Sequence, residues 1–266
     1  MPFSSAWLIS GGVALAAGTL RGYTGFGFAM TMALGLLWLL PPVEVVTTVL
    51  LLDLLGALGL VRHAWHKADG AVLKRLLPTM FLASIAGVAL MGVLPSSAAR
   101  LVVASLCLVG ALATLVQPHR GNELATHLDR RRDLRLALPA GGASGLAMSL
   151  SSAGGPPLMI YLMHSRLDPQ TARATAIVFF ISASSTALLG YLSVGLISTA
   201  TAWLALTLCP LAWLGAALGH WLFDRFPPLS YRTLVAPALI LMAGWLFFRE
   251  VRTLFFGSLS SPSVGF

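Results

Sequence analysis

A polar interruption constrains how the first sixty residues can fold. The stretch Leu20–Met30 (LRGYTGFGFAM) places one arginine and three glycines between two apolar arms, Ala6–Leu20 and Phe26–Leu40. Glycine lets a backbone turn or leave helical geometry without steric cost. Irregular backbone at membrane depth is tolerated only where it is buried in protein or lines a wet cavity. The stretch therefore predicts a break inside a membrane segment, placed at a binding site.

The composition places the whole chain in a bilayer. Of its 266 residues, 57% are hydrophobic and 10% are charged, a balance that soluble domains of this length do not keep. Stretches of about 20 apolar residues, long enough to cross a hydrocarbon core, follow one another between polar loops. We predict an all-α polytopic membrane protein. The net charge of +8 indicates basic loops on one membrane side, so no nucleic-acid partner is expected.

The rest of the chain divides into spans and a second break. The predicted spans are Val43–Val61, Val72–Leu94, Ala98–Val116, Thr171–Ser193, Ser198–Phe223 and Ser230–Phe248, with a charged loop at Arg62–Arg75. The second break, Met148–Pro157, lies between two short arms, Leu134–Ser149 and Pro156–Arg166. We therefore predict a first transmembrane repeat at 1–117, a basic cytoplasmic linker at 118–133 and a second transmembrane repeat at 134–266.

Punctuating residues recur between the two halves. A shift of 127 positions lays Gly27 on Gly154, Pro42 on Pro169 and Thr48 on Thr175. A shift of 132 lays Pro78 on Pro210, Gly87 on Gly219, Pro95 on Pro227 and Arg100 on Arg232. Such coincidences at a fixed spacing indicate an internal duplication.

The length of the arms favours inverted repeats. An arm of about 15 residues reaches only about 22 Å at 1.5 Å per residue, which is too short to cross comfortably. We therefore expect each break to form the tip of a re-entrant hairpin, followed by three transmembrane helices. Each half then crosses an odd number of times, and the second half enters inverted. Parallel repeats stay open as the alternative.

Loop charge agrees with inversion. With inverted repeats, Arg100, Arg249 and Arg252 face one side, and the other basic residues of loops and span ends face the opposite side. The positive-inside rule makes that opposite side cytoplasmic and both termini periplasmic.

Three motifs on this duplicated layout resemble the TauE/SafE sulfite-exporter family. They are Arg21–Gly27 (RGYTGFG), Gly154–Pro157 (GGPP) and Thr171–Thr175 (TARAT), and the resemblance covers nearly the whole chain. It implies secondary transport of sulfite or a small organosulfonate across the bacterial inner membrane, without an ATPase domain in the chain.

Candidate substrate-binding residues lie at both breaks. They are Arg21, Gly22, Tyr23, Thr24, Gly25 and Gly27 in the first, and Ser149, Ser151, Ser152, Gly154 and Gly155 in the second. An arginine deep in a bilayer is usually functional, and its planar donor fork suits carboxylate, sulfite or sulfonate oxygens. Backbone N–H groups at a helix start also attract anions. Close helix packing through small residues explains the glycines as well, and both interpretations can hold together.

Asp53 is the only acidic residue well inside a predicted span. Buried carboxylates in transporters often relay protons, so Asp53 is a candidate for proton coupling. A structural role as the partner of Arg21 is the alternative, and the sequence leaves both open.

These features predict a transporter that moves a small anion by alternating access, with a passive anion channel as the alternative. An enzyme of another class, an intramembrane serine protease, would need Ser144 of Gly142–Gly145 (GASG) and His220 within hydrogen-bond reach. No cofactor or metal is expected, because Cys107 and Cys209 lie in apolar segments as small hydrophobic residues. The sequence leaves a homodimer open.

Overall fold

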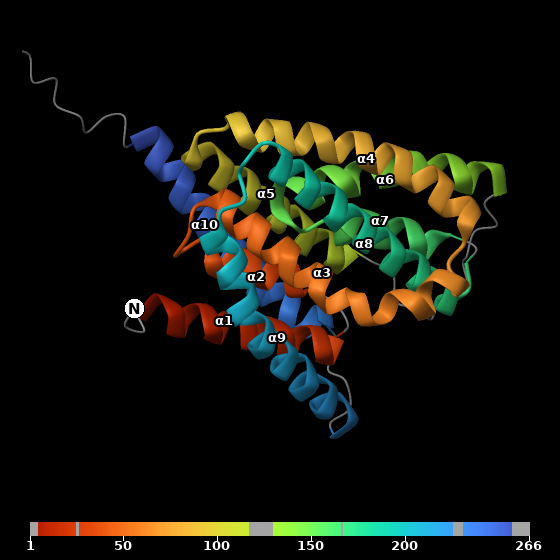
Figure 1. The fold of residues 1–266 in the computed structure, drawn as a ribbon, viewed down its shortest axis with the longest axis horizontal. Helices are drawn as coiled ribbons and strands as arrows, with labels where there is room; N and C mark the ends of the chain where they lie inside the picture. The colour runs from red at the N-terminus through yellow and green to blue at the C-terminus, as the bar shows by residue number, and fades with distance from the viewer. Residues whose placement is uncertain (1–4, 25–26, 117–129, 166, 226–230, 257–266) are drawn as a thin grey trace, which may run out of the picture.

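The computed structural model describes residues 5–24, 27–116, 130–165, 167–225 and 231–256. Within these ranges the chain forms ten α-helices and no β-strand. Figure 1 shows them packed into an elongated bundle. The helices are α1 (Ser5–Thr24), α2 (Phe28–Leu36), α3 (Pro42–Lys67), α4 (Gly70–Val93), α5 (Ser96–Val116), α6 (Arg130–Ser151), α7 (Gly155–His164), α8 (Pro169–Ser193), α9 (Thr199–Arg225) and α10 (Tyr231–Phe256).

Among the described residues, four helical segments are long and apolar enough to cross a membrane. They are Gly70–Val93, Ser96–Ala113, Pro169–Ser193 and Thr199–Arg225. All four were predicted as spans, and a helical membrane protein is therefore confirmed.

Several helices extend beyond their predicted ends. The charged loop predicted at Arg62–Arg75 is mostly helical, because α3 continues to Lys67 and α4 begins at Gly70. Asp69 makes this tight turn possible, since its carboxylate accepts the backbone N–H groups of Ala71 and Val72 as an N-cap. Hydropathy marks the edge of the apolar region, whereas a helix ends only where its backbone is capped.

The predicted linker at 118–133 is also shorter than expected. Helix α6 begins at Arg130, so the last four linker residues are helical. Residues 118–129 lie outside the described residues, and the boundary between the halves stays a prediction.

Both breaks are shorter than the sequence predicted. Helix α1 runs through Arg21 to Thr24, and Gly27 precedes α2 with a left-handed backbone, φ 92°. Helix α6 likewise continues to Ser151, and its backbone departs at Ser152, φ 58°. A single glycine inside a helix costs only about 1 kcal/mol relative to alanine. Gly22 therefore does not end α1, and only the position with a left-handed backbone requires glycine.

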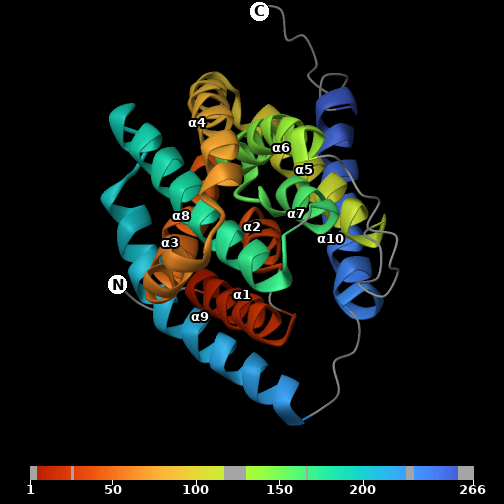
Figure 2. The same ribbon diagram turned by 90° about the vertical axis from the view of Figure 1, so that its right-hand side faces the viewer.

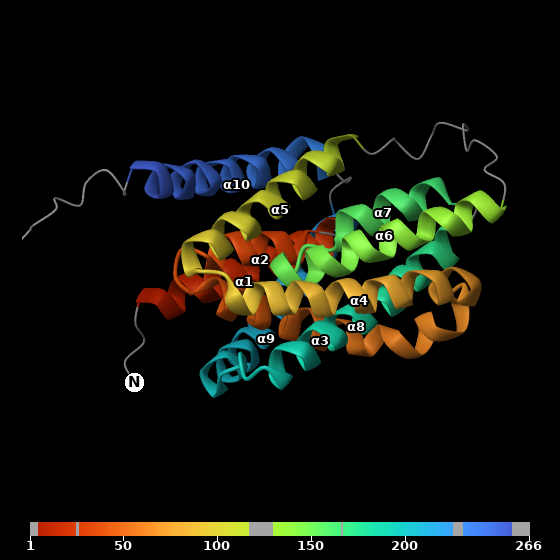
Figure 3. The same cartoon turned by 90° about the horizontal axis from the view of Figure 1, so that it is seen from above.

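Each break forms the tip of an antiparallel helical hairpin. A Cβ atom on Gly35 of α2 would meet the Val13 side chain of α1, and Leu136 of α6 shares a surface pocket with His164 of α7. In Figure 3 the start of α1 lies at one end of the long axis, and the α6–α7 hairpin enters from the other end. The two arms of the first hairpin are unequal, because α1 is about 30 Å long and α2 about 14 Å at 1.5 Å per residue.

Each half packs its first helix against the fourth helix of the other half. Helix α1 lies against α9, and α6 lies against α4, as Figure 2 shows. Helix α3 contacts α9 and α8 contacts α4, while α3 pairs with α8 and α5 with α10. The contact pattern is thus nearly unchanged when the halves are exchanged.

Glycine brings the backbones of α1 and α9 close together. A Cβ atom on Gly219 of α9 would clash with the carbonyl oxygen of Thr19, and one on Gly18 of α1 would clash with that of Ala212. Gly145 of α6 faces the backbone of Met80 in α4 in the same way. Small residues let membrane helices approach closely, and the resulting van der Waals packing holds them together.

We predict that Gly219→Ala destabilises the protein. The added methyl group meets backbone atoms that cannot turn away, and overpacking of this kind costs about 1–3 kcal/mol. The matched control is Gly12→Ala, because a Cβ atom at Gly12 of α1 has nothing within 4 Å. Thermal unfolding of the purified protein should show a lower Tm for Gly219→Ala and an equal or higher Tm for Gly12→Ala. Equal Tm values for the two variants would contradict the close packing.

Candidate functional site

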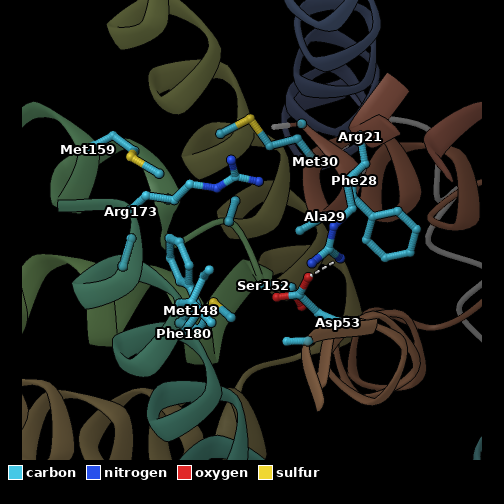
Figure 4. A pocket seen from close by; sticks show the side chains of 16 residues that line it. Arg21, Phe28, Ala29, Met30, Asp53, Met148, Ser152, Met159, Arg173 and Phe180 are labelled. Carbon is cyan, nitrogen blue, oxygen red and sulfur yellow. Dashed lines mark hydrogen bonds and ion pairs between the residues drawn. The ribbon is translucent and has the colours of Figure 1, made fainter. Parts of the chain in front are cut away.

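A cavity of about 240 Å³ lies where the two hairpin tips meet α3 and α8 (Figure 4). Residues of both breaks line it, among them Gly27 of the first and Ser152 and Gly155 of the second. The remaining lining residues are Arg21, Phe28, Ala29, Met30, Asp53, Ala57, Met148, Ala153, Met159, Arg173, Ala176, Ile177 and Phe180. The two breaks therefore lie next to one another at a single cavity.

An ion pair joins the tip of α1 to α3. Arg21 Nη1 donates to Asp53 Oδ1 at 2.8 Å, and the Arg21 guanidinium lies 5.4 Å from the centroid of the Phe28 ring. The side chains of Arg21 and Asp53 are 29% and 16% exposed, so water reaches both. The pairing of these residues, left open by the sequence, is present in the structure. A guanidinium has five N–H donors, so the pair leaves Arg21 able to bind an anion.

A second guanidinium enters the cavity from α8. Figure 4 shows Arg173 extending into the cavity on the side of Met30 and Met159, away from Asp53. Among the described residues, Arg173 has no hydrogen bond or ion pair. Sequence reasoning missed this residue because it lies near the start of a span, where basic residues usually mark the cytoplasmic side. Its place in the motif Thr171–Thr175 is the signal that could have found it.

The start of α8 holds Arg173 in place. The Asp168 carboxylate accepts the backbone N–H groups of Gln170 and Thr171 at 3.1 and 3.0 Å. The backbone N–H of Thr171 is the main cause that lowers the pKa of Asp168 below its usual value. This cap therefore stabilises the helix start above about pH 4, the range in which an unfolded Asp ionises, and is lost as pH falls through the lowered pKa. Two residues after Arg173, the hydroxyl of buried Thr175 accepts the backbone N–H of Asp69 at 3.0 Å.

Ser152 fixes the second tip against α3. Its hydroxyl donates to the carbonyl oxygen of Val46 at 3.0 Å, and its backbone has a positive φ of 58°. Residues other than glycine adopt this region rarely, so the hydrogen bond offsets part of the conformational cost. Of the three candidate serines in the second break, Ser152 is the one that lines the cavity.

Comparison with known proteins identifies the family to which this chain belongs. The family model described as sulfite exporter TauE/SafE matches residues 10–246. The chain belongs to the TauE/SafE family. Neither a curated protein nor a solved structure matches the chain. Family membership, with the four apolar helices, identifies the chain as a membrane transporter and confirms the resemblance noted from its motifs.

Several residues predicted to bind substrate in this TauE/SafE chain lie in helix packing. A Cβ atom on Gly22 would clash with the Ala216 carbonyl oxygen of α9, and the ring of Tyr23 stands edge-on to Phe223 with 6.2 Å between centroids. These contacts agree with the packing interpretation of the first break. Thr24 ends α1, although its side chain is not described, and Gly25 lies outside the described residues.

Three residues of the second break that were predicted to bind substrate, Ser149, Ser151 and Gly154, also lie outside the cavity lining. The Ser149 hydroxyl donates to the carbonyl oxygens of Gly145 and Leu146, and its own carbonyl accepts the hydroxyl of Tyr191 at 2.6 Å. Ser151 donates to the Ala147 carbonyl oxygen. Both serines are fully buried. Gly154 lies against the backbone of Ser144, outside the cavity lining. A role for these residues in binding stays a prediction.

The proposed protease dyad is not formed. Ser144 is fully buried in α6, beside Gly154, whereas His220 is exposed on α9 and its backbone faces Gly22 of α1. Because α6 packs against α4 and α9 packs against α1, these residues belong to different helix pairs. Family membership agrees, since TauE/SafE proteins are transporters.

Proposed function

We propose that this chain is a secondary transporter that moves sulfite or an organosulfonate across the bacterial inner membrane by alternating access. The observation that carries the proposal is the Arg173 guanidinium in a cavity shared by both hairpin tips, with no partner among the described residues. Oxyanions accept strong, charge-assisted hydrogen bonds from guanidinium groups. The second guanidinium, Arg21, lines the same cavity with donors beyond the one that Asp53 accepts.

The pattern of helix contacts is nearly the same when the two halves are exchanged, and this supports inverted repeats. Helix pairs α1–α9 and α6–α4 correspond under exchange of the halves, and the two hairpins enter from opposite ends of the long axis. Transporters built this way bind substrate between the repeats, near the membrane midplane, and expose it to each side by rocking one unit against the other. The cavity between the hairpin tips has the position that this mechanism requires.

The positions of helix ends support the proposed orientation. The start of α1 and the end of α10 lie at one end of the long axis, and the α3–α4 turn and the start of α6 lie at the other (Figure 3). Lys67 ends α3 and Arg130 begins α6, so basic residues gather at the second end. By the positive-inside rule this end is cytoplasmic.

Cysteine labelling tests the inverted arrangement. We predict that single cysteines replacing Arg131 and Asp224, in a background with Cys107 and Cys209 changed to Ala, react with an impermeant maleimide only from the cytoplasmic side. A cysteine replacing Arg100 should react only from the periplasmic side. Labelling of positions 131 and 224 from opposite sides would restore the parallel arrangement.

Arg173 tests the anion site. We predict that Arg173→Ala lowers the affinity for the anion by about 10- to 150-fold, because a lost charge-assisted hydrogen bond counts for about 1.5–3 kcal/mol. Arg173→Lys should retain part of the affinity, since it keeps the charge but loses the planar fork. The measurement is thermal stabilisation of the purified protein by sulfite, sulfoacetate, taurine, sulfate and lactate. Arg135→Ala, on an exposed position of α6 outside the cavity, is the matched control, and equal loss in both variants would contradict the site.

The driving force separates a transporter from a passive channel. In proteoliposomes we expect a pH gradient to accumulate a dianion such as sulfoacetate at zero membrane potential, because Asp53 offers a carboxylate that can carry a proton through the cycle. Flux that follows the membrane potential alone, with no response to the pH gradient, would instead indicate a channel.

A further inference from the structure

The charges that line the cavity do not balance. Among the described lining residues the charged ones are Arg21, Asp53 and Arg173, which give a formal charge of +1 when Asp53 is ionised. One monoanion neutralises this charge, whereas one dianion leaves an excess of −1. An unbalanced charge is costly wherever water is scarce. The cavity therefore treats monoanions and dianions differently, provided that it is the anion site proposed above.

No other titratable side chain among the described residues near α3 lines the cavity, so none can balance the extra charge of a dianion there. The elements packed against α3 are α2, α5, α6, α8 and α9. Helix α2 carries no titratable residue. The described titratable side chains of the other four, apart from Arg173, are Arg100, Cys107, Arg135, Tyr191, Cys209, His220, Asp224 and Arg225, and none of them lines the cavity. The same holds for Tyr23 of α1 and for Glu44, Arg62, His66 and Lys67 of α3. Among the described residues that line the cavity, Asp53 is thus the one that can change the charge of the cavity by gaining a proton.

We propose that Asp53 takes up one proton when the cavity binds a dianion and remains ionised when it binds a monoanion. The proton comes from the surrounding solution, where a buffer acid gives it up and becomes its conjugate base, and it forms an O–H bond on the Asp53 carboxylate. The ion pair between Arg21 and Asp53 is given up, and the Arg21 guanidinium turns its charge to the anion. Two guanidinium charges then face the two charges of the dianion, so the occupied cavity is neutral.

The geometry permits this exchange. Asp53 is 16% exposed, so protons can reach it through water, and among the described residues its hydrogen-bond partner is Arg21. Arg21 is 29% exposed and also faces Phe28, which can hold the guanidinium after Asp53 releases it. Arg173 supplies the second positive charge from the opposite side of the cavity (Figure 4). Either kind of anion then moves the same net charge per molecule carried, but only the dianion brings a proton.

Proton counting by calorimetry tests the proposal on the full-length purified protein. Two probes differ by one charge at nearly constant shape: sulfoacetate is a dianion at neutral pH, and sulfoacetamide is a monoanion. Titrations in buffers with different heats of ionisation give the number of protons bound with each probe. We expect about one proton with sulfoacetate and about none with sulfoacetamide. The affinity for sulfoacetate should fall by up to tenfold per unit rise in pH, while that for sulfoacetamide stays level.

Two variants identify the group that takes the proton. Asp53→Asn should bind sulfoacetate without proton uptake, because the cavity already has a charge of +2. Arg173→Gln lowers the resting charge to zero, so saturation with sulfoacetamide should now take up about one proton. The control Arg173→Lys keeps the charge and should reproduce the wild-type proton counts. The Arg173 variants test the charge balance even if Asp53→Asn fails to fold.

The outcomes separate this proposal from the proposed function. Binding of both probes without a difference in proton uptake overturns the role of Asp53 and leaves the anion site standing. Proton uptake that persists in Asp53→Asn assigns the proton to another group and also overturns it. Binding of sulfoacetamide alone rejects the dianion state. Failure of every anion to bind overturns the site itself.

Discussion

The ion pair between Arg21 and Asp53 allows a charge to lie at the tip of a membrane hairpin. A single charged side chain at the centre of a membrane helix costs about 2.5–3.5 kcal/mol on insertion scales. Here the two opposite charges lie 2.8 Å apart in a cavity that remains partly exposed, which lowers that cost for both. The pair also joins the first hairpin to α3, the helix that Ser152 of the second hairpin contacts through Val46. One helix thus connects the two tips.

Close backbone contact through glycine supplies the rigidity around this site. The contacts of Gly18 and Gly219 join α1 to α9, and those of Gly145 join α6 to α4. Each contact pair links helices from different halves. In the alternating access proposed above, the units that rock would therefore be the pairs α1–α9 and α4–α6, each of which combines helices of both halves, around the cavity at the hairpin tips.

The cavity itself combines few charges with an adaptable apolar wall. Met30, Met148 and Met159 contribute flexible thioether side chains, while Phe28 and Phe180 contribute rings. Methionine fits irregular shapes without a fixed rotamer. For the organic anion proposed above, we expect this wall to contact the uncharged part of the molecule while the two guanidinium groups face its oxygens. The arginines would then set the orientation of the anion, and the methionines would accommodate different substituents.

The class of the protein, most of its helices and the two places where membrane segments break could all be predicted from the amino-acid sequence. These features are local, since they follow from apolar length, from glycine and from proline, as the break before Pro156 shows. Family membership also followed from the short motifs around Arg21, Gly154 and Arg173. Which of these residues meet became clear only from the way in which the helices pack. This packing placed Arg173 in the cavity, paired Arg21 with Asp53 and turned Gly22 and Ser149 into packing contacts. A helix has several faces, and the helix that packs against it can lie far away in sequence. That partner determines which face forms a site and which face is buried.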